Sequence, residues 1–147
     1  MSDDEKVAKD LVETLKDGEH GFASASEKLQ DGDHPGWATT LQRLAEQRAG
    51  FRREMIALGH KYGDDVDESG SAAAALHRGW ISLKDALTGD DAGGVLGAAV
   101  TGEDHAVSEY EKALEQDLTA GFREVVSRQH AAVVAARAEV KALQTAS

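Results

Sequence analysis

The residues of this chain that could do chemistry are polar side chains set into apolar helical patterns. Arg48, Glu103 and Gln129 each stand at a position where the surrounding pattern calls for an apolar residue. A charged group in such a position must find a partner, because burying an unpaired charge is very unfavourable. The pattern therefore predicts a buried polar layer, which either a metal ion or an ion pair could complete.

A dinuclear metal centre is the first interpretation of this layer. Helical bundles hold two bridged iron or manganese ions with inward-facing carboxylates and imidazoles. The residues that could act as ligands lie near the midpoints of the predicted helices and are Glu19, Glu46, Glu103, Gln129 and His130. Two features oppose this interpretation, because the chain contains no Glu-x-x-His and Arg48 brings a fixed positive charge to the position of the metal.

An internal ion pair is the second interpretation, and the residue types favour it. Glu103 would hold Arg48. Glu19 or Glu46 would supply a further carboxylate, and Gln129 would supply further hydrogen bonds. The expected members of this buried layer are Arg48, Glu103, Gln129 and Glu19. Buried polar residues of this kind fix the register of similar helices at some cost in stability.

The elements that must position these residues are helices. Apolar residues recur at spacings of three and four along four long segments, about 4–30, 36–62, 91–116 and 119–145, and along a shorter one, about 72–88. Pro35 suits the first position of the second long helix, and Thr119 suits the N-cap of the fourth. The glycines near the start of the third long segment predict a loose beginning for that helix.

The lengths of these segments predict the topology. Each long helix would span roughly 37 Å, and the connection between the second and third is long enough to return along the bundle. The first two long helices would then be antiparallel, as would the last two, while the second and third would run parallel. We therefore expect an all-α fold, a ferritin-like four-helix bundle with a short crossover helix, formed by residues 1–147 as a single domain.

Composition excludes several classes of function. The 147 residues include 16 Lys and Arg but 27 Asp and Glu, and a formal charge of −11 repels phosphate backbones and anionic lipids. We expect no nucleic-acid or membrane partner. The chain has no cysteine, and its acidic N-terminus lacks the features of a signal peptide, so we expect a cytoplasmic protein. Its exposed helix faces are expected to form a homo-oligomer, a dimer or a larger assembly.

Two further groups of residues were candidates for a site. His77, Arg78 and Trp80 lie on the predicted crossover helix, where they could line a pocket, although packing of the tryptophan is the favoured interpretation. Asp17 and His20 have a ligand-like spacing on the first helix, but the pattern predicts that both face solvent.

Several short motifs together resemble a known family. They are Leu15-Lys16-Asp17-Gly18 with Gly21-Phe22, Ala49-Gly50-Phe51, Gly70-Ser71 before Leu76-His77-Arg78-Gly79-Trp80, and Gly102-Glu103-Asp104 with Tyr110. In order and spacing they look like a bacterial family of ferritin-like four-helix-bundle proteins of unknown function, distantly related in fold to rubrerythrins and stress-induced ferritin-like proteins. The resemblance covers almost the whole chain.

The resemblance implies a fold and a possible role in stress. Glu103 followed by Tyr110 is similar to the third-helix Glu-x6-Tyr of rubrerythrins, in which the glutamate binds metal. Relatives with working centres would carry histidines where this chain has Arg48, Ala49, Ser127 and Gln129. We therefore expect a non-catalytic, stress-associated protein that acts through protein interactions or assembly. The alternative is a dinuclear iron or manganese protein, an oxidoreductase of the ferritin or rubrerythrin type, that handles iron or reactive oxygen species.

Overall fold

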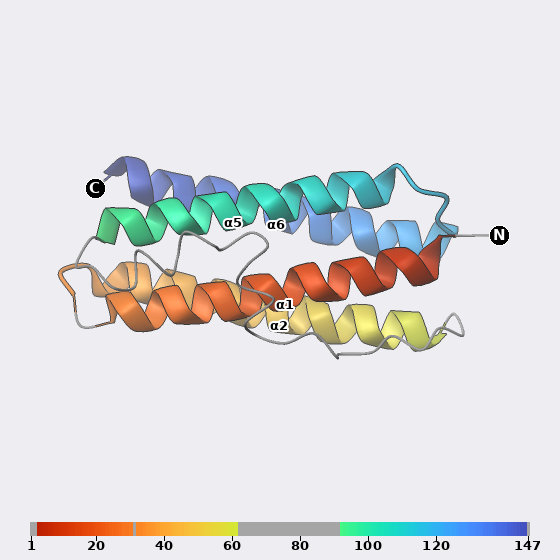
Figure 1. Ribbon diagram of the computed structural model, residues 1–147, viewed down its shortest axis with the longest axis horizontal. Coiled ribbons are helices and arrows are strands. Elements are labelled where there is room, and N and C mark those ends of the chain that lie inside the picture. Colours follow the sequence, from red (N-terminus) through yellow and green to blue (C-terminus); the bar gives the residue numbers. More distant parts are fainter. Residues whose placement is uncertain (1–2, 31, 62–91, 147) are drawn as a thin grey trace.

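The computed structural model describes residues 3–30, 32–61 and 92–146. These residues form four helices, α1 (Asp4–Leu29), α2 (Pro35–Lys61), α5 (Ala92–Leu114) and α6 (Ala120–Ala146), in an all-α four-helix bundle (Figure 1). The four long helices are confirmed, with ends within two residues of those predicted. The predicted crossover helix 72–88 lies outside the described residues, as do His77, Arg78 and Trp80.

The directions of the helices agree with the prediction. α1 is antiparallel to α2, and α5 is antiparallel to α6 (Figure 1). α2 ends at the opposite end of the bundle from the start of α5, so these two helices run in the same direction (Figure 1). α1 packs against α2 and α5, and α6 packs against α5 and α2, which places α2 and α5 on a diagonal. None of the described helices is long and apolar enough to cross a membrane.

Local sequence explains where the helices begin. Pro35 occupies the first position of α2, where a missing N–H leaves no hydrogen bond unmade. Just before it, the ring of His34 stacks on Trp37 with centroids 3.7 Å apart. α5 is helical from Ala92, and its first turns contain the glycines on which the expectation of a loose start depends.

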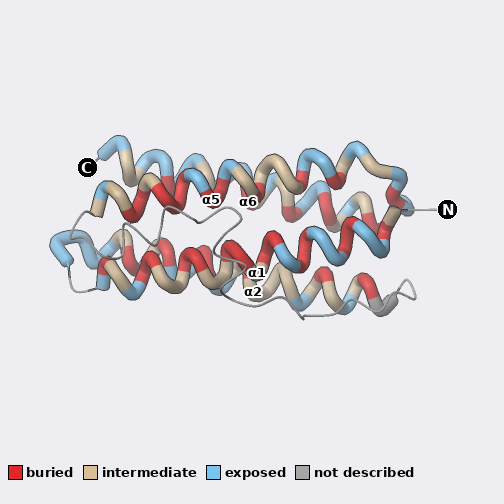
Figure 2. Tube along the Cα trace, viewed as in Figure 1, coloured by how far each residue is buried: buried red, intermediate tan, exposed pale blue. Residues whose placement is uncertain are grey.

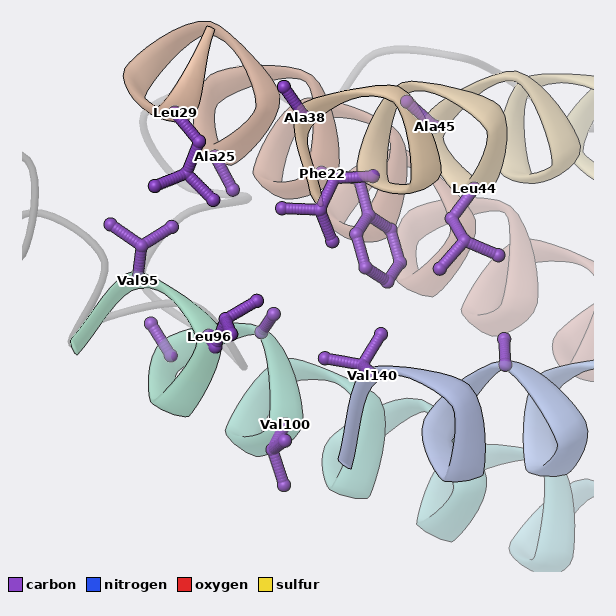
Figure 3. Packing of buried hydrophobic residues seen from close by; sticks show 14 residues of the cluster. Phe22, Ala25, Leu29, Ala38, Leu44, Ala45, Val95, Leu96, Val100 and Val140 are labelled. Atoms are coloured by element: carbon purple, nitrogen blue, oxygen red, sulfur yellow. The ribbon is translucent and has the colours of Figure 1, made fainter. Parts of the chain in front are cut away.

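The apolar core is divided into two clusters. The first fills one end of the bundle, where Phe22 and Leu44 point across to Val140 (Figure 3). The second fills the other end around Leu15, Phe122 and their neighbours. Buried residues therefore follow the inner face of every described helix (Figure 2). The interval between the clusters contains Arg48 on α2 and Glu103 on α5.

A set of hydrogen bonds ties the start of α1 to the loop between α5 and α6. The backbone N–H of Asp3 donates to the carbonyl of Asp117 at 2.6 Å. The Asp4 carboxylate accepts from the N–H of Thr119 at 3.0 Å and from its hydroxyl at 2.7 Å. Thr119 immediately precedes α6, as predicted for an N-cap. Its hydroxyl donates a hydrogen bond to the Asp4 carboxylate. These bonds link the start of α1 to the α5–α6 loop at the same end of the bundle.

Candidate functional site

The centre of the candidate site is a buried ion pair between α2 and α5. Arg48 Nη1 donates to Glu103 Oε1 at 2.5 Å, and Arg48 Nη2 donates to Glu103 Oε2 at 2.6 Å. The side chains of Arg48 and Glu103 are only 1% and 0% exposed. Such a two-bond pair is strong and directional because the guanidinium and the carboxylate are planar and match in spacing. It spans the diagonal of the bundle and joins two helices that pack mainly against others.

Helix α1 supplies the space for the guanidinium. A Cβ added at Gly18 would lie 3.3 Å from Arg48 Cγ and 3.3 Å from Arg48 Nη1, which is closer than ordinary packing allows. The Arg48 Cζ atom lies 5.2 Å from the ring centroid of Phe22, a favourable cation–π distance. Arg48 Nε donates to Gln47 Oε1 at 3.2 Å. Gly18 and Phe22 therefore form the wall against which the arginine lies.

A second polar cluster lies beside the ion pair and leads to the surface. Tyr110 donates its hydroxyl to Gln129 Oε1 at 2.7 Å, and Gln129 Nε2 donates to Glu54 Oε1 at 2.7 Å. Gln129 Nε2 also lies 3.5 Å from the carbonyl oxygen of Phe51. Glu54 accepts a bond from the half-exposed Arg128. The prediction that Gln129 is buried is confirmed, but its hydrogen bonds go to this cluster.

The tyrosine of this cluster is a permanent donor. Burial raises the pKa of Tyr110 far above its ordinary value, while Arg48 opposes that rise and Glu54 and Glu103 reinforce it. The hydroxyl therefore keeps its proton at all physiological pH values and can hold the amide oxygen of Gln129 in place.

Three predicted site residues lie elsewhere. Glu19 was expected in the buried layer, but its side chain is 26% exposed and accepts from Arg52 Nε at 2.8 Å. Successive residues of a helix are about 100° apart around its axis. Glu19 follows Gly18, which faces the interior, so the Glu19 side chain lies at the edge between α1 and α2. Glu46 is exposed on α2. His130 is partly exposed on α6, with Nε2 4.0 Å from a carboxylate oxygen of Glu111.

The predicted exposure of Asp17 is also wrong. Its side chain is buried, with 1% relative exposure, whereas His20 is only partly covered. The reason is that α1 packs against both α2 and α5 and so buries a wider arc than a single apolar stripe indicates.

These positions do not suit a dinuclear metal centre. Of the five candidate ligands, only Glu103 and Gln129 are buried in the interior, and Arg48 holds both oxygens of Glu103. Across the described ranges, no group of three or more His, Asp or Glu side chains is placed to hold a metal ion. The ligand set therefore does not fit, and the ion pair satisfies the buried carboxylate in its place.

Three members of the site were not predicted as part of the polar layer, although Tyr110 belongs to the motif that resembles rubrerythrins. Tyr110 follows Glu103 by seven residues, which is two helical turns, and its place in the same stripe could have indicated a role in the layer. Glu54 and Arg128 stand on helix flanks, where nothing in the sequence indicates that they would meet.

Comparisons with known proteins give one family. The model of the family described as Domain of unknown function (DUF2383) matches residues 5–116. The match includes both partners of the buried ion pair, Tyr110 and Glu54, while α6 with Gln129 and Arg128 lies beyond it. No curated protein matches the chain.

Proposed function

The chain belongs to the DUF2383 family, and on that premise we propose that it is a non-catalytic helical-bundle protein that acts through protein interactions or assembly. The observation that carries this proposal is the ion pair of Arg48 and Glu103. Every carboxylate oxygen of Glu103 is occupied by a guanidinium donor, in a place that water does not reach. A buried pair of this kind defines one register of the helices and offers no free group to a substrate.

The hollows on the surface support the same proposal. A hollow of about 190 Å³ between α1 and α5 is lined by Lys6, Asp10, Glu109 and Lys112, among others. Two more lie near the turn between α1 and α2. None of these three hollows is lined by Arg48, Glu103 or Gln129, so the polar layer has no opening through them.

A ferritin-like relationship is part of the proposal. Two antiparallel pairs of helices with α2 and α5 parallel are the arrangement of ferritin-like bundles, in which a metal centre occupies the waist. In this chain an arginine and a glutamate would occupy the equivalent place. The association with stress comes from the resemblance of the sequence motifs, and a rise in abundance under oxidative or metal stress in the native host is its test.

Metal analysis separates this proposal from the di-metal alternative. Protein produced without a metal-binding tag, in medium supplemented with iron and manganese, should contain less than about a tenth of an equivalent of either metal. Glu103→Gln removes the buried carboxylate, and Glu124→Gln is the matched control because Glu124 is exposed and is not one of the candidate ligands. One or more equivalents of metal that disappear in Glu103→Gln but persist in the control would overturn the non-catalytic proposal.

A further inference from the structure

The outer face of α6 differs from the outer faces of α1 and α2. Among the described residues, Val134 is the one large apolar side chain that is exposed, with a relative exposure of 43%. Beside it lies a stripe of exposed alanines that follow one another at spacings of three and four, namely Ala131, Ala135, Ala138 and Ala142. Figure 2 shows exposed residues, in pale blue, recurring along the whole length of α6. The exposed residues of α1 and α2, in contrast, include Glu5, Lys9, Glu13, Arg43, Glu46 and Arg53.

Two opposite charges border this face on the side of α2. Arg128 pairs with Glu54, and Glu139 pairs with Arg43, so both lie on the flank of α6 that faces α2. Their side chains remain 54% and 42% exposed. They are three helical turns apart, and the midpoint between them falls next to Val134. Each charge is already paired with a residue of α2, so the α6 members of these two ion pairs are positive on one side of Val134 and negative on the other.

This charge pattern is complementary to itself under one symmetry operation. A twofold axis perpendicular to α6 near Val134 makes the helices of two copies antiparallel and brings equivalent flanks together. Arg128 of each copy then faces Glu139 of the other. A parallel twofold pairing would instead place the two equivalent flanks on opposite sides of the contact, so Arg128 would not meet Glu139 of the other copy. The small alanine side chains allow the two helices to approach closely.

We propose that two copies of this chain pair through the outer face of α6, antiparallel about an axis near Val134. This inference rests on the assembly part of the proposed function and names its surface. A contact formed mainly along one helix of 27 residues, roughly 40 Å long, is small, so the dimer should be weak and concentration-dependent. The mass would rise from 15.6 kDa towards twice that value.

The absence of cysteine makes a direct test possible. Val134→Cys introduces a single thiol that lies close to its equivalent in the proposed dimer, within reach of a disulfide. Glu124→Cys is exposed on the same helix, but its equivalent lies roughly 30 Å away in the antiparallel arrangement. Ala57→Cys is the matched control, because Ala57 is an exposed residue of α2.

The proposal expects oxidation to crosslink Val134→Cys at least about tenfold faster than either other variant, since the dimer raises the effective thiol concentration. Equal crosslinking of Glu124→Cys indicates parallel pairing and overturns the twofold arrangement. Equal crosslinking of Ala57→Cys shows random collision and overturns the interface. A protein that sediments as a monomer at all concentrations also overturns it and leaves this face to a different kind of partner.

A second variant tests the same interface without introducing a thiol. Val134→Glu should lower the sedimenting mass to that of the monomer while Ala57→Glu does not, and circular dichroism should show unchanged helix content in both. Retention of the dimer by Val134→Glu would contradict the proposal. These outcomes do not depend on Arg48 or Glu103, so failure of the α6 interface and failure of the buried ion-pair proposal are distinguishable.

Discussion

Replacing Arg48 with methionine is the sharpest test of the buried ion pair. Methionine has a similar apolar stem, so the substitution removes mainly the guanidinium and its two bonds to Glu103. The Glu103 side chain is 0% exposed and would keep its carboxylate in the core with no cationic partner. Breaking a buried pair by removing one member costs about 3–5 kcal/mol in free energy of unfolding. For a chain of this length the midpoint of thermal unfolding should fall by roughly 10 °C.

Urea unfolding followed by circular dichroism measures this loss directly. Arg43→Met is the matched control, because Arg43 and its partner Glu139 are 55% and 42% exposed. An exposed pair contributes less than about 1 kcal/mol, so the control should remain close to the parent protein. The double variant Arg48→Met with Glu103→Leu should recover most of the loss, because no unpaired charge then remains in the core.

Either of two outcomes would refute this reasoning. If Arg48→Met were as stable as the parent protein, or if the double variant were no more stable than Arg48→Met, the pair could not be the buried lock of the bundle. A coupling free energy of about 2 kcal/mol or more from the four-protein cycle is the expected positive result.

Three further predictions concern Gly18 beside the pair, Tyr110 in the neighbouring polar cluster, and Asp10 on the surface of α1. Gly18→Ala should destabilise by about 1 kcal/mol despite better helix propensity, because its Cβ would press on the held guanidinium. A Cβ at Gly50 would only touch the end of the Arg53 side chain at 4.0 Å, so Gly50→Ala should be neutral or stabilising. Tyr110→Phe should cost about 1–3 kcal/mol by removing the donor to the buried oxygen of Gln129, measured by urea unfolding. Asp10 is exposed, but partial burial of its carboxylate still raises the pKa of Asp10 above 3.8, with Glu109 and Glu13 adding to the rise against Lys6, so Asp10→Asn should stabilise the protein slightly at neutral pH. That gain should fade as the pH falls through the raised pKa and vanish below about 3.8, where Asp10 is protonated in both states, as urea titrations at several pH values would show.

The comparison of Gly18→Ala with Gly50→Ala tests whether α1 constrains Arg48. If Gly18→Ala were stabilising to the same extent as Gly50→Ala, then Arg48 would have room to move and the wall formed by α1 would not constrain it. An equal gain for Asp10→Asn at acidic and neutral pH would show that burial of that carboxylate does not influence stability.

Helix extents and the presence of polar residues inside the bundle were predictable from the sequence. Both follow from local periodicity, since a residue three or four places from its apolar neighbours faces the same side of a helix. That rule placed Arg48, Glu103 and Gln129 in the interior, and all three are buried. It also placed the ends of the four long helices within two residues.

The partners of these residues could not be predicted, because partner choice depends on how helices pack and how far side chains reach. Arg48 crosses a diagonal to Glu103, while Gln129 turns to Tyr110 and Glu54. Glu19 lies outside the buried layer because it is one residue, about 100° around the helix, beyond the inward-facing Gly18. Periodicity describes each helix alone, whereas these bonds depend on the relative rotation and height of separate helices, which the packing of the whole bundle establishes.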